Sequence, residues 1–209
     1  VTAHNLPAYR SSVIRVDKEP DFSEPLEYLA FIKNIYHYKE VFIANLTGAI
    51  ILSTDKNNIG RDVVSTQYFQ EALKGKTFFS DIMPSPVPIE NEFGELELGL
   101  PTMFVSNQIT SEKMEVLGVL VYRLDVNELI KLIIPMKATE TGEIYLINKE
   151  GFMLTKSRFT ENLKESGIIK KRTPLELKMT NPKTGNLTLA VQQCLKGQEG
   201  YNETGYLDY

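Results

Sequence analysis

Residues 40–54, EVFIANLTGAIILST, are followed 103 positions later by residues 143–157, EIYLINKEGFMLTKS, a stretch of the same pattern. Each copy begins with a glutamate and contains an asparagine followed three positions later by a glycine, with β-branched, aromatic and leucine side chains on both sides. Glycine accepts a positive φ at little cost, so each copy predicts a β-hairpin that turns at its glycine. A unit that occurs twice in one chain predicts two modules of the same kind.

A second repeat follows the first. Residues 69–75, FQEALKG, return 122 positions later as residues 191–197, VQQCLKG, so the second copy contains an insertion. Apolar side chains at helical spacing predict a helix in each copy, with Ser65 or Thr66 as the N-cap of the first and a glycine after both. The one cysteine, Cys194, is expected to be buried on the second helix.

Further elements complete the first copy. Helical spacing in residues 8–39 predicts a helix ahead of the first hairpin, and residues 84–99 form a long loop rich in proline and glutamate. Three strands and a short exit helix are expected at Thr77–Met83, Leu100–Ile109, Val116–Val126 and Asn127–Ile134. The second copy offers only one strand after its helix, residues 201–209, so its sheet is expected to be smaller.

The composition of the chain argues against several classes of function. The chain has 209 residues and a formal net charge of −4, which disfavours a nucleic-acid surface. No run of about 18 apolar residues is present to span a bilayer. One cysteine excludes an internal disulfide, and the sequence has no nucleophile elbow, phosphate-binding loop or zinc-ligand spacing. We therefore expect this domain to be no enzyme and to hold no cofactor and no metal.

Several short motifs, in one order along the chain, resemble the double Cache sensor domain, the extracytoplasmic ligand-binding part of prokaryotic sensor histidine kinases, chemoreceptors and diguanylate cyclases. The motifs are NIGR at 58–61, YFQEALKG at 68–75, SD at 80–81, LGVLVYRLD at 117–125, GEIYLINKEG at 142–151, TKSRF at 155–159 and GYLDY at 205–209.

The resemblance implies a mixed α/β fold: a long N-terminal helix plus two tandem PAS-like modules, each an antiparallel sheet with helices. It divides the chain into an N-terminal helical stalk (1–39), a membrane-distal ligand-binding module (40–134) and a membrane-proximal module (143–209) that is incomplete at its C-terminal end.

The resemblance also implies a function. The chain is expected to be the extracytoplasmic ligand-sensing domain, periplasmic or extracellular, of a membrane-anchored receptor, in first place a sensor histidine kinase, that forms a homodimer through the N-terminal helix. One alternative is a module with a vestigial pocket that signals through a partner protein or by dimerisation. Another is the sensor of a chemoreceptor or a diguanylate cyclase.

The amino-acid-binding members of this family place an arginine, two aromatic residues and several carboxylates around their ligand. Carried over by position, the arginine becomes Thr66, the aromatic pair becomes Tyr68 and Phe69, and the carboxylate on the last strand becomes Arg123. Two further strand positions, a tyrosine and an aspartate in those members, are Met83 and Ser85. The carboxylates that bind an ammonium are lost, which argues against an α-amino acid ligand.

Arg123 carries the ligand hypothesis. It shares one strand face with Leu117, Val119, Val121 and Asp125, and a buried guanidinium needs a partner. That partner is either the carboxylate of a small organic anion or an internal acid, Asp125 or Asp81; a third alternative is that the guanidinium reaches solvent at the end of the strand, and all three are left open. The candidate ligand-binding residues are Tyr68, Phe69, Ser80, Ser85, Phe104, Ser106, Tyr122 and Arg123.

Overall fold

The computed structural model describes residues 23–91, 93–133 and 143–201. Residues 1–22 of the predicted stalk, the link between the modules and all but the first residue of the predicted last strand lie outside these ranges. The chain forms two compact units. One comprises the described residues up to Asp81 together with Thr102–Val126, and the other comprises Ile82–Pro101 and the described residues from Asn127 onward.

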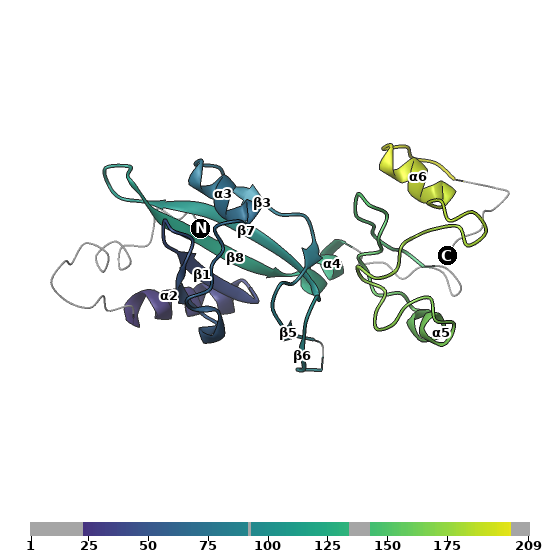
Figure 1. Ribbon diagram of the computed structural model, residues 1–209, viewed down its shortest axis with the longest axis horizontal. Helices are drawn as coiled ribbons and strands as arrows, with labels where there is room; N and C mark the ends of the chain where they lie inside the picture. Colours follow the sequence, from purple (N-terminus) through teal and green to yellow (C-terminus); the bar gives the residue numbers. More distant parts are fainter. Residues whose placement is uncertain (1–22, 92, 134–142, 202–209) are drawn as a thin grey trace. The chain divides into compact units, whose positions relative to one another are not determined.

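The first unit is built on the hairpin predicted from the repeat (Figure 1). Strands β1 (Glu40–Ala44) and β2 (Ile50–Ser53) pair antiparallel. The turn between them has Gly48 at φ +88°, where a side chain would be strained. The carboxamide oxygen of Asn45 accepts hydrogen bonds from the backbone N–H of Thr47 and of Ala49, both at 3.0 Å. The asparagine and the glycine of the repeat therefore shape this turn together.

One antiparallel sheet contains most of the strands. Its order is β2-β1-β8-β7-β3, with β4 paired to β7 off this path. The strands that follow the hairpin are β3 (Phe78–Phe79), β4 (Met83–Pro84), β7 (Pro101–Thr110) and β8 (Val116–Asp125). Strand β8 lies between β1 and β7, so residues far apart in sequence become direct neighbours at the centre of the sheet.

The two faces of this sheet bury different clusters. Helices α2 (Ser23–Ile35) and α3 (Gln67–Leu73) lie on opposite sides of it, as Figure 1 shows. The α2 face is packed with Leu29, Ile32, Val41, Ile43, Leu52, Ile109, Leu120 and Tyr122. The α3 face is packed with Phe42, Ala44, Ile50, Val63, Tyr68, Phe69, Ala72, Phe104, Val119 and Val121. This division follows the strict alternation of side chains along each strand.

Shorter elements join these parts. The 3₁₀ helix η2 (Lys56–Asn58) follows the hairpin, and α4 (Val126–Ile133) follows β8. The segment predicted as one long loop contains a small hairpin, β5 (Ile89–Glu90) with β6 (Leu96–Glu97). No described helix is long and apolar enough to cross a bilayer.

The second unit repeats the local geometry of the first. The N–H of Gly151 bonds to the carbonyl of Asn148 at 3.0 Å, as Gly48 does to Asn45, and φ of Gly151 is +82°. The Asn148 side chain accepts from the backbone N–H of Glu150 and Phe152, which match Thr47 and Ala49. The bridge between Ile147 and Met153 corresponds to the pairing of Ala44 with Ile50. The same turn is therefore present twice.

The helices repeat as well. Helix α6 (Leu189–Leu195) has the length of α3, lies 122 positions after it, and follows a threonine N-cap as α3 does. Gly75 and Gly197 both have positive φ after these helices. The mixed α/β class with an N-terminal helix and antiparallel sheets is confirmed.

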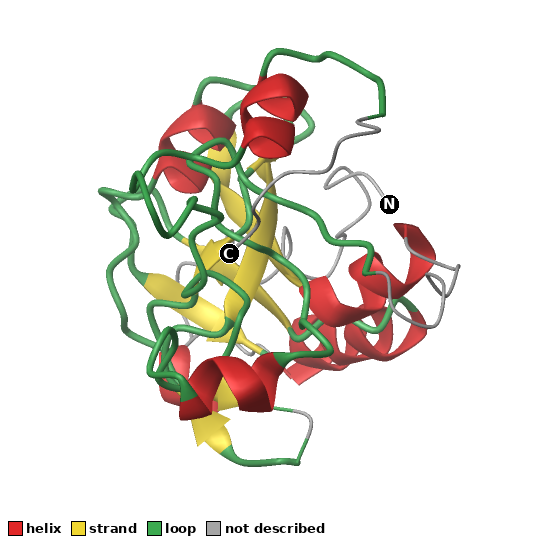
Figure 2. Ribbon diagram, turned by 90° about the vertical axis from the view of Figure 1, so that its right-hand side faces the viewer, coloured by secondary structure: helices red, strands yellow, loops and turns green. Residues whose placement is uncertain are grey.

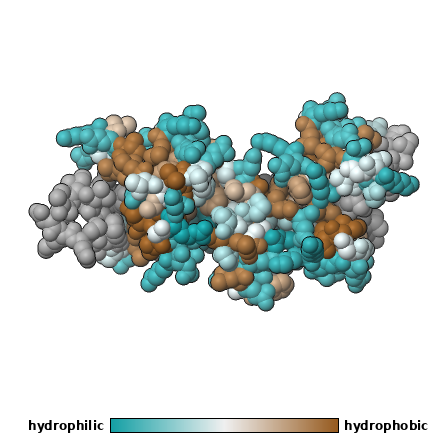
Figure 3. All heavy atoms as spheres, viewed as in Figure 1, coloured by the Kyte–Doolittle hydropathy of each residue, from teal (hydrophilic) through white to brown (hydrophobic). Residues whose placement is uncertain are grey.

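The second unit has less regular secondary structure than the first. Between residues 143 and 201, antiparallel pairing is limited to isolated bridges, and the helices are α5 (Thr160–Glu165) and α6. Figure 2 shows how much of this part is loop, and in Figure 3 hydrophobic side chains lie in separate patches among hydrophilic ones. The expected burial of Cys194 is wrong, because its side chain is exposed. Val191 alone is buried on α6, so the other apolar side chains of the helix are less covered than the repeat suggested.

Candidate functional site on the α3 face

Three neighbouring strands place a row of side chains across the α3 face of the sheet. Glu40 on β1 is directly opposite Arg123 on β8, and Arg123 is directly opposite Phe104 on β7. All three side chains are almost completely buried. The row exists because β8 lies between β1 and β7 in the sheet. Its residues are about 20 to 80 positions away from their partners in sequence, and the order of the strands brings them side by side.

Glu40 and Arg123, the two charged residues of this row, form a buried ion pair. Arg123 Nη2 lies 3.0 Å from Glu40 Oε2, and the side chains are 5% and 2% exposed. The two atoms are not in hydrogen-bond geometry, and Glu40 Oε2 accepts no hydrogen bond from any described residue. Burial lowers the pKa of Arg123 and the Glu40 charge opposes that shift. The guanidinium stays protonated, since its ordinary pKa is far above neutral.

Neutral donors hold the other oxygen of Glu40. Glu40 Oε1 accepts from the Ser53 hydroxyl at 2.6 Å and from the Asn58 amide at 2.9 Å. The side-chain oxygen of Asn58 accepts in turn from Nη1 of Arg61 at 3.3 Å. The hairpin and the following 3₁₀ turn thus stabilise the carboxylate independently of Arg123.

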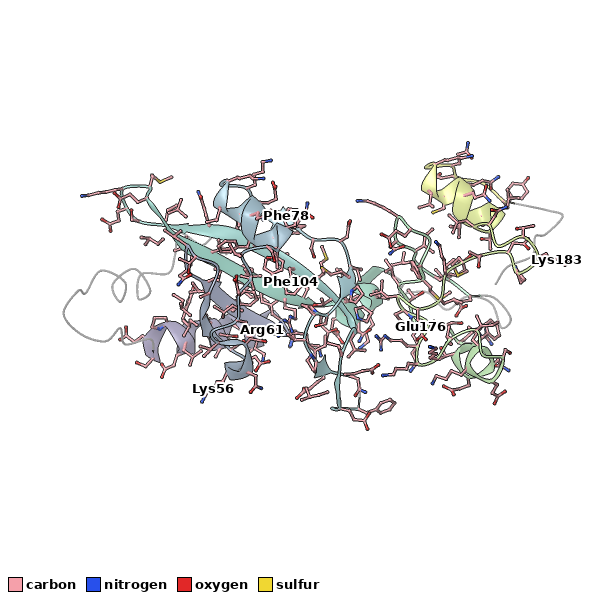
Figure 4. The ribbon with its side chains drawn as sticks, in the orientation of Figure 1. Lys56, Arg61, Phe78, Phe104, Glu176 and Lys183 are labelled. Atoms are coloured by element: carbon pink, nitrogen blue, oxygen red, sulfur yellow. The ribbon has the colours of Figure 1, made fainter. Side chains whose placement is uncertain are left out.

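Aromatic rings cover the guanidinium. Its central carbon lies 5.3 Å from the centroid of the Phe104 ring, within cation–π range. Tyr68 of α3 stacks on Phe104 with centroids 4.6 Å apart, and Phe42 meets Tyr68 edge-on at 6.3 Å. Burial raises the pKa of the Tyr68 hydroxyl, so it is neutral at physiological pH. Figure 4 labels Phe104 on the sheet and Arg61 on the loop nearby.

Two buried donors on this face lack partners. Neither Arg123 Nε nor the Thr102 hydroxyl forms a hydrogen bond with a described residue. Thr102 shares the face of Phe104 and is the diagonal neighbour of Arg123 on the adjacent strand. Buried polar groups are normally satisfied, so two orphan donors at one place need an explanation. A carboxylate or hydroxyl of a ligand is the kind of group that both would bind.

The structure gathers five of the eight candidate residues around this row. Phe104 contacts both Tyr68 and Arg123, and the Ser106 hydroxyl donates to the backbone carbonyl of Tyr68 at 2.6 Å. Phe69 is buried in the same cluster. Strand alternation in the sequence puts Thr102, Phe104 and Ser106 on one face, as the structure has them, and it does not point to Glu40. The glutamate shared by both repeats was the available signal for Glu40.

The remaining three candidates lie outside this row or form hydrogen bonds with backbone groups. Tyr122 is on the opposite face, in the α2 cluster, and its pKa is raised by burial and by Tyr38. Ser85 lies in the second unit and donates to Val87 at 2.7 Å. The Ser80 hydroxyl accepts from the N–H of Phe104 and donates to the Asp81 carbonyl. Tyr122 therefore does not belong to the row on the α3 face, and Ser85 belongs to the other unit.

The internal partner proposed for Arg123 was also wrong. The acid opposite it is Glu40 rather than Asp125 or Asp81, and Asp125 contacts Lys39 at 3.0 Å. Among the described residues, no group of three or more histidine, cysteine, aspartate or glutamate side chains is placed to hold a metal ion.

Comparison with known proteins agrees on the fold. No protein-family model and no curated protein matches the chain. The ligand-binding domain of the Campylobacter jejuni chemoreceptor Tlp3 in complex with 4-methylisoleucine is similar, at 16% identity and a TM-score of 0.51, covering 76% of this chain and 57% of that one. The Tlp3 sensory domain with isoleucine bound is similar at 17% identity and a TM-score of 0.50, covering 78% and 64%.

The sensor domain of the histidine kinase DctB from V. cholerae is a further match, at 16% identity and a TM-score of 0.44, covering 57% of this chain and 43% of that one. The chain thus spans less than two thirds of the length of each of these three solved chains. The fold is that of the sensor domains of chemoreceptors, and the resemblance to double Cache sensor domains is confirmed at the level of the fold.

Proposed function

We propose that this chain is the extracytoplasmic ligand-sensing domain of a membrane-anchored signal-transduction receptor, in first place a sensor histidine kinase. Its stalk would comprise residues 1–39, its ligand-binding module residues 40–134 and its membrane-proximal module residues 143–209. The fold shared with chemoreceptor sensor domains supports the class. A chemoreceptor or a diguanylate cyclase is the alternative output.

The proposed ligand is a small organic anion bound on the α3 face. The observation that carries this proposal is the buried Nε–H of Arg123, which makes no hydrogen bond with any described residue. Glu40 already has Ser53 and Asn58 as donors, so a second carboxylate can share the guanidinium. The hydroxyl of Thr102 supplies a further donor. An ammonium ligand would be repelled here, because the side chain that it would meet is the cation of Arg123 and not a free carboxylate.

One observation favours the alternative of a module that signals without a ligand. The contact between Glu40 and Arg123 neutralises the buried charge internally, and both side chains are at most 5% exposed. In that case the pair stabilises the sheet, and signalling depends on a partner protein or on dimerisation. Binding experiments distinguish the two.

A thermal-shift and calorimetric screen of carboxylates and amines tests the proposed site. Carboxylates are expected to stabilise the protein, and Arg123→Lys, which keeps a cation beside Glu40 but loses the planar fork, is expected to weaken binding about tenfold or more. Thr102→Val removes one donor and is expected to weaken binding by about two- to tenfold. Its folding stability is expected to hold, since the hydroxyl has no partner to lose.

Thr155→Val is the matched control, because Thr155 in the second unit also has a buried hydroxyl without a hydrogen-bond partner among the described residues. This variant is expected to bind as tightly as the wild type. Stabilisation by amines, or equal carboxylate affinity in all four proteins, would show that Arg123 and Thr102 do not form a ligand site.

A homodimer through the N-terminal helix is the proposed assembly. Phe31 and Ile35 lie one turn apart on α2 and are 59% and 52% exposed. Substituting both by glutamate is expected to weaken association at least tenfold, because two apolar side chains are lost and two like charges are brought together. Sedimentation of the wild type and the variant measures the change, and an unchanged monomer–dimer equilibrium excludes this face.

A further inference from the structure

The backbone of residues 170–172 in the second unit is held by one carboxylate. Glu176 accepts hydrogen bonds from the N–H of Lys170, Lys171 and Arg172 at 2.5, 3.1 and 3.0 Å. Burial alone would raise the pKa of Glu176, but these three donors lower it overall. Leu175, just before it, has φ +62°, a strained conformation for leucine. The backbone of the loop is thereby fixed; Figure 4 labels Glu176.

Arg172 ties this loop to the small hairpin β5–β6. Its guanidinium forms an ion pair with Glu97 and donates to the carbonyl oxygen of Gly99 at 2.7 Å. Gly99 has φ +78°, and a Cβ there would lie 3.0 Å from the guanidinium. The charges of Arg172 and Glu97 therefore compensate each other, and the two segments form a pair of walls within the second unit.

A depression of about 480 Å³ lies between these walls. Its lining residues are Asn91, Glu95, Leu96, Glu97, Lys164, Lys170, Lys171 and Arg172. Lys170 and Lys171 form no ion pair with any described residue, and Lys164 contacts Glu161 at 3.0 Å. Arg172 and Glu97 compensate each other, as do Lys164 and Glu161, so the ammonium groups of Lys170 and Lys171 remain against the single carboxylate of Glu95. The depression is thus cationic in a chain whose formal net charge is −4.

We propose that this depression is a second binding site, specific for a phosphate group. Lysine is a common phosphate ligand because its ammonium is a compact charge with three donors. The amide nitrogen of Asn91 lies in the same lining and donates to Glu95 at 3.2 Å, which leaves its second N–H as a neutral donor. The volume is in the range of small-molecule sites. The proposal is independent of the site at Arg123, which lies in the first unit.

Isothermal titration with pyrophosphate, together with flotation on phosphatidylglycerol and phosphatidylcholine vesicles, tests the site. Pyrophosphate is expected to bind, and the double variant Lys170→Gln/Lys171→Gln is expected to weaken binding about tenfold or more, since two charge-assisted contacts are lost. Stronger binding to phosphatidylglycerol than to free pyrophosphate, lost in the same variant, would identify a lipid headgroup as the source of the phosphate. Phosphatidylcholine vesicles are expected to bind weakly.

The control is Lys183→Gln/Lys196→Gln, which removes two exposed lysines outside the lining of the depression. It lowers the net charge equally, so it is expected to bind like the wild type if the site is specific. Absence of binding to pyrophosphate and to phosphatidylglycerol, or an equal loss in both double variants, would overturn the proposal. Circular dichroism of each variant confirms that a loss of binding is not a loss of folding.

Discussion

Glu40→Gln is expected to lower the free energy of unfolding by about 3–5 kcal/mol, the usual cost of leaving one member of a buried ion pair alone. The guanidinium of Arg123 is 5% exposed, and its buried Nε–H makes no hydrogen bond with any described residue, so the charge would be uncompensated. Arginine does not escape this cost by losing a proton. Urea unfolding at neutral pH measures the effect.

The reverse substitution, Arg123→Met, is expected to cost less. The remaining carboxylate of Glu40 keeps the Ser53 and Asn58 donors. The double variant Glu40→Gln/Arg123→Met is expected to recover most of the lost stability, since no buried charge remains. If the two single variants lose equal stability, the independent support of Glu40 by Ser53 and Asn58 is refuted.

Asp125→Asn is the control for this pair. Asp125, the last residue of β8, contacts Lys39, which directly precedes β1, and the side chains are 16% and 34% exposed. Solvent screens such a pair, so the loss is expected to stay below about 1 kcal/mol. If Asp125→Asn lowered the free energy of unfolding as much as Glu40→Gln, burial would not be what makes the Glu40–Arg123 pair more costly to break.

The local elements were predictable because their signals are local. The turn at Gly48 follows from an asparagine and a glycine at fixed spacing, and the helix at Gln67–Leu73 follows from apolar side chains at helical spacing with a glycine after them. Long strands β7 and β8 were within one or two residues of their predicted bounds. Side-chain alternation then placed Phe104 and Arg123 on the faces where the structure has them.

The pairing of strands was not predictable in the same way. Glu40 meets Arg123 only because β1 lies beside β8, and the sequence of either strand carries no sign of that neighbour. For the same reason the sequence suggested Asp125 as the partner of Arg123, because the two residues are close in sequence. In the second unit, the hairpin residues 143–157 keep the turn but form only an isolated bridge, since strand pairing depends on neighbours as well as on local pattern.

Gly48→Ala is expected to destabilise the protein by about 2–5 kcal/mol. The positive φ of +88° adds a strain of about 1–2 kcal/mol for a residue with a side chain. The added Cβ would also lie 2.6 Å from Cβ and 2.7 Å from N of Val64, atoms that cannot rotate away. Overpacking of that kind costs about 1–3 kcal/mol.

Gly60→Ala separates these two contributions. Gly60 has φ +84°, nearly that of Gly48, but nothing lies within 4 Å of the added Cβ. Its loss is therefore expected to be about 1–2 kcal/mol, from backbone strain alone. The difference between the two variants in urea unfolding measures the contact with Val64. That contact is significant because the carbonyl of Gly48 accepts from the N–H of buried Val63, which packs against the cluster beneath α3. Equal losses in both variants would show that the hairpin turn does not position this segment.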